Sequence, residues 1–248
     1  MSVPGQMATA AKPGLTPVEV ALSSGEMKIT GRLVDATNAT LLAKVIDEEN
    51  EIVCIYKPIA GERPLWDFST GTLAQREFAA YLVSTLGNFD VVPLTVLRDG
   101  PYGEGMVQQW IDIDEKLDML EFFRRDEPTL RNIALFDAVI NNTDRKIGHL
   151  LPDAHGKVYG CDHGVTFHSQ DKLRTVLWQW AGQSLTESEV SQLHNLRSLL
   201  TLSLGPLLLP LLSREELVAL EMRLDRLLTL QTFPIPSDEW PAVPWPPF

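Results

Sequence analysis

The amino-terminal half of the chain alternates short apolar runs with polar turns, a pattern typical of β-strands joined by tight connections. Apolar runs at 27–33 and 40–46 flank a turn of small and hydroxyl-bearing residues, and a polar turn at 47–50 leads into a third run at 52–56. The three runs predict an antiparallel sheet whose third strand ends at Lys57.

One helix interrupts this β-rich region. Thr72 and Gln75 have the spacing of a capping box, and apolar positions continue from there to Leu86. Two further strands are predicted at 91–97 and 105–111, around a turn that contains glycine and proline.

In the carboxyl-terminal half, apolar positions recur at the helical period. They predict a helix at 129–140, and two short strand-like runs follow at 148–151 and 158–161. Capping-box signatures at Thr186 and Ser213 predict two more helices in the leucine-rich remainder.

Together these elements predict an α+β fold of two lobes that share a cleft. Residues 1–16 are rich in small residues and proline and indicate a disordered leader. A β-rich lobe with one helix is expected at 17–111 and a helical lobe at 112–231. The segment 232–248 is rich in proline and tryptophan, and is expected to be extended, either packed on the domain or loose.

Composition excludes some partners. The formal net charge of -12 argues against nucleic acid, whose phosphates an acidic surface repels. Stable membrane insertion is not expected, because no run reaches the roughly 18 apolar residues that span a bilayer. Cys54 and Cys161 lie in apolar runs, which predicts two buried thiols in a reducing compartment. With no signal peptide recognised, we expect a cytoplasmic protein.

Lys57 and Glu77 are the first candidates for chemistry. A lysine at a strand end can point its ammonium group into a cleft, although most such lysines lie on the surface. Glu77 stands among apolar positions of the predicted helix, where a carboxylate needs a partner or must sit on the exposed side. Lys57 is the predicted partner.

Two segments, 141–151 and 159–164, carry the strongest signal. The first resembles the kinase catalytic loop, Asp-x-Lys-x-x-Asn, and is more similar to the loop of the phosphatidylinositol 3-/4-kinase superfamily, Asp-Arg-x-x-x-Asn. The second resembles the metal-binding Asp-x-Gly turn that follows this loop. Phosphoryl transfer needs a phosphate-binding cation with its anchor, a base and carboxylate-held metal, and the candidates occur in this order.

Further segments resemble type II phosphatidylinositol 4-kinases: 55–58 with 61–64, then 77–82, 91–93 and 178–180. The likeness covers about residues 27–185, and we interpret the chain as a bacterial branch of this superfamily, with a two-lobed protein-kinase-like fold.

The resemblance implies a role for each matching residue. Lys57 would bind phosphate, Glu77 would orient it, and Asp162 would hold Mg²⁺ or Mn²⁺ against ATP. The implied catalytic residues are Asp144 as the base, with Arg145 and Lys146 beside it. A turn replaces the glycine-rich loop and would offer phosphate contacts from Thr37, Asn38 and Thr40. The hinge beneath adenine would be 106–111, with Gln108, Gln109 and Trp110.

His149 departs from the pattern, because it stands where the superfamily has a metal-binding asparagine. Imidazole suits transition metals better than Mg²⁺. His149 could therefore ligate Mn²⁺, leave Mg²⁺ to Asp162 and water, mark a site without turnover, or be purely structural. Zinc is not expected, since the spacing of the nearby histidines matches no zinc motif.

The function predicted is ATP- and metal-dependent transfer of phosphate to a hydroxyl group. The acceptor expected is a protein or a small soluble molecule, because the basic surface and anchoring cysteines of the lipid kinases are absent from the sequence. The alternatives are a nucleotide-binding pseudokinase that serves a protein partner as sensor or scaffold, and a fold in which the motifs are coincidental.

Overall fold

A five-stranded antiparallel sheet forms the smaller lobe, in the strand order β1-β2-β3-β5-β4. The structure is a computed structural model and describes residues 16–33, 38–47 and 50–248. The strands are β1 (Glu26–Arg32), β2 (Leu41–Asp47), β3 (Asn50–Pro58), β4 (Thr95–Gly100) and β5 (Gly103–Gln109). The predicted hairpin and third strand are therefore present, and Lys57 lies near the end of β3.

A short helix that the sequence interpretation missed, α1 (Pro17–Ser24), packs against the sheet through the buried Leu22. It begins with a capping box in which Thr16 Oγ1 accepts a hydrogen bond from Glu19 N and Glu19 Oε2 accepts one from Thr16 N. This Thr-x-x-Glu spacing is visible in the sequence and could have predicted the helix. The rest of the predicted leader lies outside the described residues.

Helix α2 (Leu73–Leu86) is present, but its predicted capping box is wrong. The hydroxyl of Thr72 donates to Ser69 O and accepts no bond from a backbone N–H of the helix. The carboxylate of Glu62 takes this place and accepts from Leu73 N at 3.2 Å and Ala74 N at 2.9 Å. A carboxylate satisfies the free N–H groups and also faces the positive end of the helix dipole, which explains why it displaces a hydroxyl.

Replacing Glu62 by alanine is expected to lower the free energy of unfolding by about 1 kcal/mol, because two N–H groups of α2 lose their acceptor. Urea denaturation would measure the loss. Thr72→Ala is the matched control and should cost less than Glu62→Ala, since the Thr72 hydroxyl accepts no bond from a backbone N–H of the helix and only a long one, 3.4 Å, from the Arg76 side chain. A larger loss for Thr72→Ala would contradict the assignment of the cap.

Strand β4 begins later than the strand predicted at 91–97. The N–H groups of Val91 and Val92 both donate to Ser84 Oγ, at 2.8 and 3.0 Å, and Pro93 has no N–H to give. The Ser84 hydroxyl in α2 thus accepts hydrogen bonds from the two N–H groups that a strand would have paired with its neighbour.

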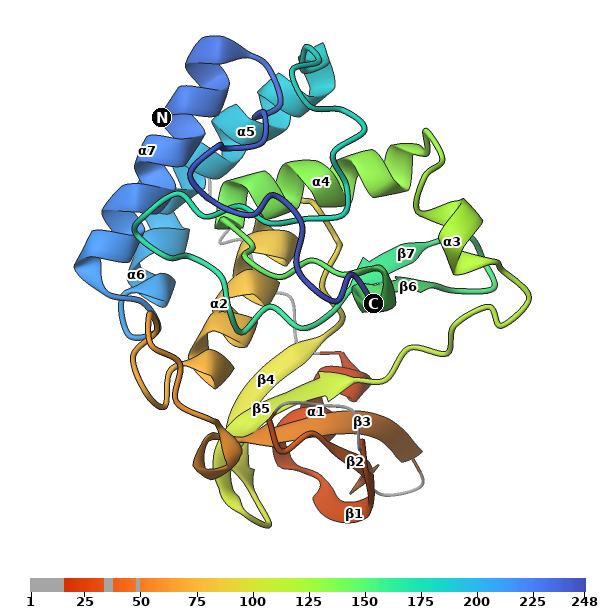
Figure 1. The fold of residues 1–248 in the computed structure, drawn as a ribbon. Helices are drawn as coiled ribbons and strands as arrows, with labels where there is room; N and C mark the ends of the chain where they lie inside the picture. Colours follow the sequence, from red (N-terminus) through yellow and green to blue (C-terminus); the bar gives the residue numbers. More distant parts are fainter. Residues whose placement is uncertain (1–15, 34–37, 48–49) are drawn as a thin grey trace, which may run out of the picture.

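The larger lobe is helical and is built around α4 (Pro128–Ile140), most of whose residues are buried. Figure 1 shows α2, α5 and α7 surrounding α4. The other elements are η1 (Ile59–Gly61), α3 (Met119–Phe122), η2 (Ile147–His149), β6 (Leu150–Pro152), β7 (Val158–Gly160), α5 (Glu187–Leu199), η3 (Leu200–Leu204), α6 (Gly205–Leu208) and α7 (Arg214–Leu230). The predicted capping boxes of α5 and α7 are confirmed. The α+β class with a sheet lobe and a helical lobe is confirmed as well.

The carboxyl-terminal segment 232–248 packs back on the helical lobe (Figure 1), and the end of the chain contacts η2, where Pro247 O accepts a hydrogen bond from Ile147 N. Cys54 and Cys161 are both free thiols, but only Cys54 is buried and Cys161 is half-buried. Across the described ranges, we find no helix with the length and apolar character that a membrane span requires.

Candidate active site

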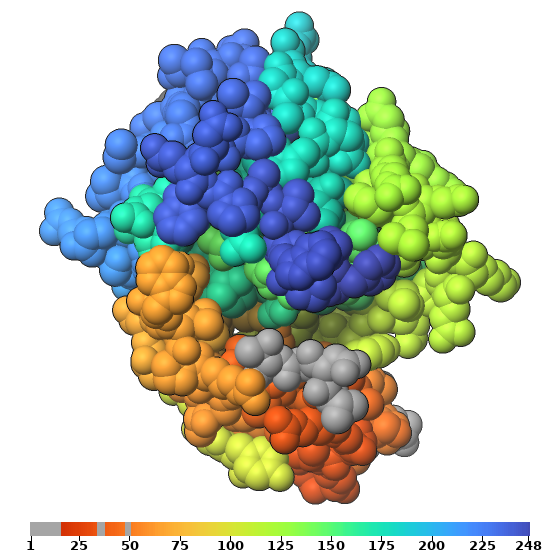
Figure 2. Space-filling view, viewed as in Figure 1, coloured from red at the N-terminus to blue at the C-terminus, as the bar shows by residue number. Residues whose placement is uncertain are grey.

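A cavity of about 160 Å³ lies between the lobes and is lined from both sides. In Figure 2 the sheet lobe, red to orange, and the helical lobe, green to blue, meet along an indented boundary. The sheet lobe and α2 contribute Lys57 and Glu77, and the helical lobe contributes Asp144 and Asp162. Four residues that are far apart in the sequence therefore share one cavity.

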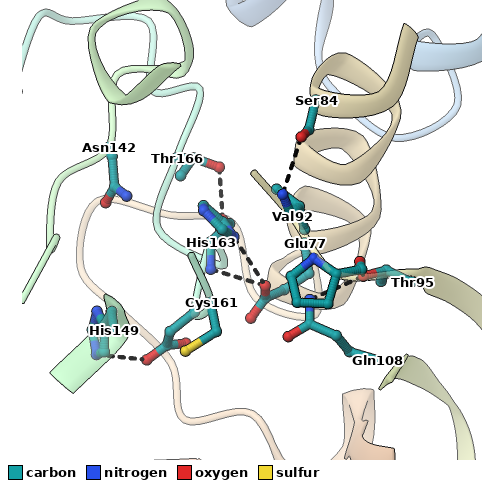
Figure 3. A network of polar contacts seen from close by, with 12 residues as sticks. Glu77, Ser84, Val92, Thr95, Gln108, Asn142, His149, Cys161, His163 and Thr166 are labelled. Carbon is teal, nitrogen blue, oxygen red and sulfur yellow. Dashed lines mark hydrogen bonds and ion pairs between the residues drawn. The ribbon is translucent and has the colours of Figure 1, made fainter. Parts of the chain in front are cut away.

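Lys57 is the centre of this group. Its Nζ lies 2.6 Å from Glu77 Oε1 and 2.8 Å from Asp162 Oδ1. The second oxygen of Glu77 accepts a hydrogen bond from His163 N at 2.8 Å (Figure 3). Because both oxygens of this nearly inaccessible carboxylate are engaged, Glu77 ties β3 and α2 to the turn that carries Asp162.

The charges in the cavity are set by these contacts. Burial alone would lower the pKa of Lys57, but the Asp162 and Glu77 carboxylates outweigh it and raise that pKa above its ordinary value. In return, the Lys57 ammonium holds the pKa of Asp162 well below its usual range. Lys57 is thus cationic and Asp162 anionic at neutral pH.

Asp162 also has an unusual backbone. Its φ of 60° lies in the left-handed region, which aspartate tolerates better than most residues. The side chain is half exposed even though the turn around it is buried. The conformation presents a carboxylate to the cavity from an otherwise packed segment.

Asp144 is positioned by the end of α4. The helix ends where Asn141 adopts a left-handed conformation, and the next residue, Asn142, accepts a hydrogen bond from Asp144 N at 3.0 Å. Burial raises the pKa of the Asp144 carboxyl, while Lys146, whose Nζ is 3.5 Å from Asp144 Oδ2, opposes the shift. An anchored carboxylate of raised pKa suits a general base.

The predicted catalytic role of Arg145 does not fit its position. Its side chain is fully buried and donates to both oxygens of Asp137, with distances of 2.9 and 3.0 Å, and to Cys161 O at 3.0 Å. A guanidinium with no exposed surface cannot touch a substrate. Arg145 instead joins α4, the loop that carries Asp144 and the turn that carries Asp162.

His149 lies against Asp162, with its Nε2 3.5 Å from Asp162 Oδ2. Its Nδ1 accepts a hydrogen bond from Lys146 N at 3.4 Å, which leaves the ring proton of the neutral form on Nε2. In this tautomer Nε2 donates toward Asp162 and offers no lone pair to a metal. The geometry therefore favours a role for His149 in orienting Asp162, and disfavours its predicted role as a metal ligand.

Burial lowers the pKa of His149 to about 4, so we expect a pH-dependent loss of stability. Between pH 6.5 and 4 the unfolded chain binds a proton that the native His149 does not, and the free energy of unfolding therefore falls as the pH falls. At pH 5 the loss from His149 is about 2 kcal/mol, at about 1.4 kcal/mol per pKa unit.

Urea denaturation at pH 7 and pH 5, with chelator present, would measure this loss. His149→Gln should show a smaller difference between the two pH values than the unsubstituted chain. His194→Gln, at an exposed position of α5, is the matched control. An unchanged difference in His149→Gln would show that the native His149 does titrate like an exposed imidazole.

The donor set fits a hard divalent cation only in part. Across residues 16–33, 38–47 and 50–248, no group of three or more His, Cys, Asp and Glu side chains is arranged to hold a metal ion. Two carboxylates, Asp144 and Asp162, nevertheless line the same cavity as Lys57. Mg²⁺ and Mn²⁺ accept one or two carboxylates when phosphate oxygens and water complete the shell.

The residues predicted to replace a glycine-rich loop are only partly in place. Thr37 lies outside the described residues, Asn38 lines the cavity, and Thr40 is buried away from the cavity lining. Asn38 Oδ1 accepts from Arg63 N at 2.8 Å, which pins the turn to the segment after η1. Of the two that the structure describes, Asn38 is the one placed to meet a ligand in this cavity.

The hinge residues do not line this cavity. The side chain of Gln108 is buried and donates to Thr95 Oγ1 at 2.9 Å, as Figure 3 shows. The Trp110 indole donates to Asp112 at 3.1 Å. Gln109, at the end of β5, also lies outside the lining, so adenine binding at the hinge stays a prediction.

Several residues of the site escaped the sequence interpretation. Glu62 lines the cavity, and Asp137, Asn142 and His163 surround Arg145. Asn142 and His163 lie within the two polar segments and could have been included with them. Nothing in the sequence marked Asp137, which looks like one more residue of an amphipathic helix.

Comparisons with known proteins give a relative and a fold. No protein-family model matches the chain. Protein Rv2133c of Mycobacterium tuberculosis is 37% identical over 262 residues, a match that covers 92% of this chain and 94% of that protein.

Among solved structures, the crystal structure of the Golgi casein kinase matches with a TM-score of 0.54 and 16% identity, over 86% of this chain and 73% of that one. Its structure with Mn/ADP bound gives a TM-score of 0.56 and 16% identity, over 86% and 74%. The likeness shows the fold, which is the two-lobed kinase-like fold.

Proposed function

The chain belongs to the same family as Protein Rv2133c, and we propose that it is an ATP- and metal-dependent phosphotransferase. The observation that carries the proposal is the convergence of Lys57, Glu77, Asp144 and Asp162 on one cavity between the lobes of a kinase-like fold. We place it in the phosphatidylinositol 3-/4-kinase-like superfamily, nearest to the type II phosphatidylinositol 4-kinases, on its sequence motifs alone.

The proposed reaction moves the γ-phosphoryl group of ATP to an acceptor hydroxyl. The bond between the γ-phosphorus and the bridging oxygen breaks, ADP leaves, and a new bond forms to the acceptor oxygen. Asp144 takes the proton of the hydroxyl, for which its raised pKa suits it. Lys146, beside Asp144, is placed to meet negative charge on the transferred group.

Lys57 binds the phosphates and Glu77 keeps it in position. The Lys57 ammonium already lies between two carboxylates, so it reaches the cavity without rearranging its stem. Asp162, oriented by His149, would hold the divalent cation, which supplies neutralisation of charge on the phosphate oxygens. The Golgi casein kinase structure with Mn/ADP supports a nucleotide with a divalent metal in this fold.

We propose a protein or a small soluble alcohol as the acceptor, as the sequence predicted. A net charge of -12 disfavours an anionic membrane surface as the place where the acceptor is found. The cytoplasmic location stays a prediction.

Incubation with γ-labelled ATP and either Mn²⁺ or Mg²⁺ tests the proposal. Label is expected on the chain itself or on an added acceptor, and it should disappear in the presence of chelator. Lys57→Met should lose the label, with Lys116→Met, a lysine outside the cavity, as the control. Equal labelling by Lys57→Met would exclude the proposed cavity as the site of transfer.

A nucleotide-binding pseudokinase is the second candidate, and the position of His149 is the observation that favours it. Its proton-bearing Nε2 faces the carboxylate that would hold the metal. This candidate predicts that nucleotide raises the melting temperature without any turnover, and that His149→Asn creates or increases transfer. No gain in His149→Asn, with label transferred by the unsubstituted chain, would exclude it.

A further inference from the structure

The carboxyl-terminal segment crosses the helical lobe in two anchored stretches. The first is fixed by Phe233, whose ring is buried and whose N–H and carbonyl bond with Gln183 and Gly182. Residues 235–239 are exposed, and the second stretch, 240–248, then returns to the protein surface. Figure 2 shows the end of the chain, in dark blue, at the boundary between the lobes.

The second stretch is held mainly by its backbone. Ala242 O accepts from Thr175 N at 3.1 Å and from the Trp178 indole at 2.8 Å. Pro247 O accepts from Ile147 N at 2.8 Å. Ile147 closely follows Asp144 in the chain, so this end of the segment lies against the proposed catalytic loop.

The segment that receives the tail is itself paired with that loop. Arg145 N donates to Arg174 O and Val176 N donates to Arg145 O, both at 3.1 Å. Thr175, between them, turns its N–H to the other side, where the tail lies. The tail therefore contacts both the catalytic loop, at Ile147, and residues 174–176, which pair with that loop at Arg145.

A cationic clasp holds the start of the second stretch. Lys172 Nζ lies 4.7 Å from the ring centres of both Trp66 and Trp240, and 3.0 Å from Asp67 Oδ2. Trp66 and Asp67 lie between η1 and α2, and Trp240 belongs to the tail. The tail is thus joined to the segment between η1 and α2 by a lysine that lies between two indole rings.

Trp245 and Phe248 are 86% and 56% exposed, although both are large and apolar, whereas Pro244 between Ala242 and the end of the chain is buried. A groove that donates hydrogen bonds to main-chain carbonyls can hold a polypeptide in extended form.

Basic residues adjoin the segments that hold the tail, although the chain is acidic as a whole. Lys146 and Arg174 are the neighbours of Ile147 and Thr175 in the chain, and Lys172 contacts Trp240, while Lys146 and Lys172 are also paired with Asp144 and Asp67. Among the described residues, Arg174 Nε is buried with no hydrogen-bond partner. An acidic group on a ligand would supply the partner that Arg174 lacks.

We propose that the acceptor is an acidic, hydroxyl-bearing polypeptide that binds in extended form along residues 172–178, in the groove that residues 240–248 fill as a built-in competitor. The inference rests on the proposed phosphotransferase function, which it deepens by naming the substrate class. A small alcohol or a lipid head group would not need paired main-chain donors at Ile147 and Thr175.

The competing tail makes a prediction about binding. A fluorescent peptide with the sequence of residues 237–248 should bind Trp240→Ala about tenfold more tightly than the unsubstituted chain, because a tethered competitor acts at high effective concentration. Trp178→Phe removes an indole donor of the groove itself and keeps a ring, so it should not tighten peptide binding. Trp245→Ala is the matched control and should bind within about twofold of the unsubstituted chain, since that indole is exposed.

The same variants distinguish a polypeptide acceptor from a small alcohol or a lipid head group. With dephosphorylated casein as an acidic acceptor, Trp240→Ala should lower the KM for casein about tenfold and leave the KM for ATP unchanged. The peptide should compete with casein and not with ATP. Three results would overturn the inference. The first is equal peptide affinity in all variants, and the second is inhibition by the peptide that leaves the KM for casein unchanged. The third is transfer to glycerol or to phosphatidylinositol vesicles that the peptide does not inhibit. Peptide binding is measured by anisotropy without turnover, so the groove is tested even where no phosphate is transferred.

Discussion

Replacing Asp162 by asparagine is expected to lower phosphoryl transfer about a thousandfold. Asp162 is the carboxylate that the Lys57 ammonium keeps ionised and that faces the cavity from a strained backbone conformation. Losing this charge removes the proposed hold on the divalent cation, which is worth several kcal/mol, and about 4 kcal/mol corresponds to a thousandfold. The fold should survive, because the Asp162 side chain is half exposed and the Lys57–Glu77 pair remains.

Two measurements separate this loss from a general effect on the protein. Transfer of label from ATP in the presence of Mn²⁺ gives the rate, and the shift in melting temperature with Mn²⁺ and ATP gives binding. Asp225→Asn, at an exposed aspartate of α7 whose partner is Arg197, is the control and should retain both. An Asp162→Asn protein that keeps its rate would exclude Asp162 as the metal-holding residue.

The second large effect is expected on stability, from the buried pair of Asp137 and Arg145. Both side chains are fully buried, and the guanidinium also donates to Cys161 O. Asp137→Asn or Arg145→Met alone should each lower the free energy of unfolding by about 3–5 kcal/mol, because a buried charge is left without its counter-charge. Activity should fall as well, since Arg145 holds the loop of Asp144 to the turn of Asp162.

A double-mutant cycle would show that the pair acts as a unit. Asp137→Asn combined with Arg145→Met should lose clearly less stability in urea than the sum of the two single losses, because no lone charge remains buried. The surface pair of Arg197 and Asp225 provides the contrast, where Asp225→Asn should cost at most about 1 kcal/mol. Additive losses at the buried pair would contradict the proposed coupling.

Much of the fold could be predicted from the sequence because the deciding interactions are local. Alternating apolar residues predicted the β1–β2 hairpin and β3, and the helical period with capping boxes predicted α5 and α7. The order of Lys57, Glu77, Asp144 and Asp162 predicted a common cavity, which the structure contains. The start of strand β4 was predicted too early in the chain. The reason is that Ser84, which lies in α2, accepts the hydrogen bonds of Val91 N and Val92 N with its hydroxyl oxygen.

What the sequence alone determined, then, is the series of local elements and the residue types able to handle phosphate. The tertiary structure decided which of those residues meet. It buried Arg145 against Asp137, brought Glu62 to the start of α2, and placed Lys172 between Trp66 and Trp240. The physical reason is that a side chain's partner and its exposure depend on packing between distant segments, and such contacts leave no period or spacing in the chain from which they could be read.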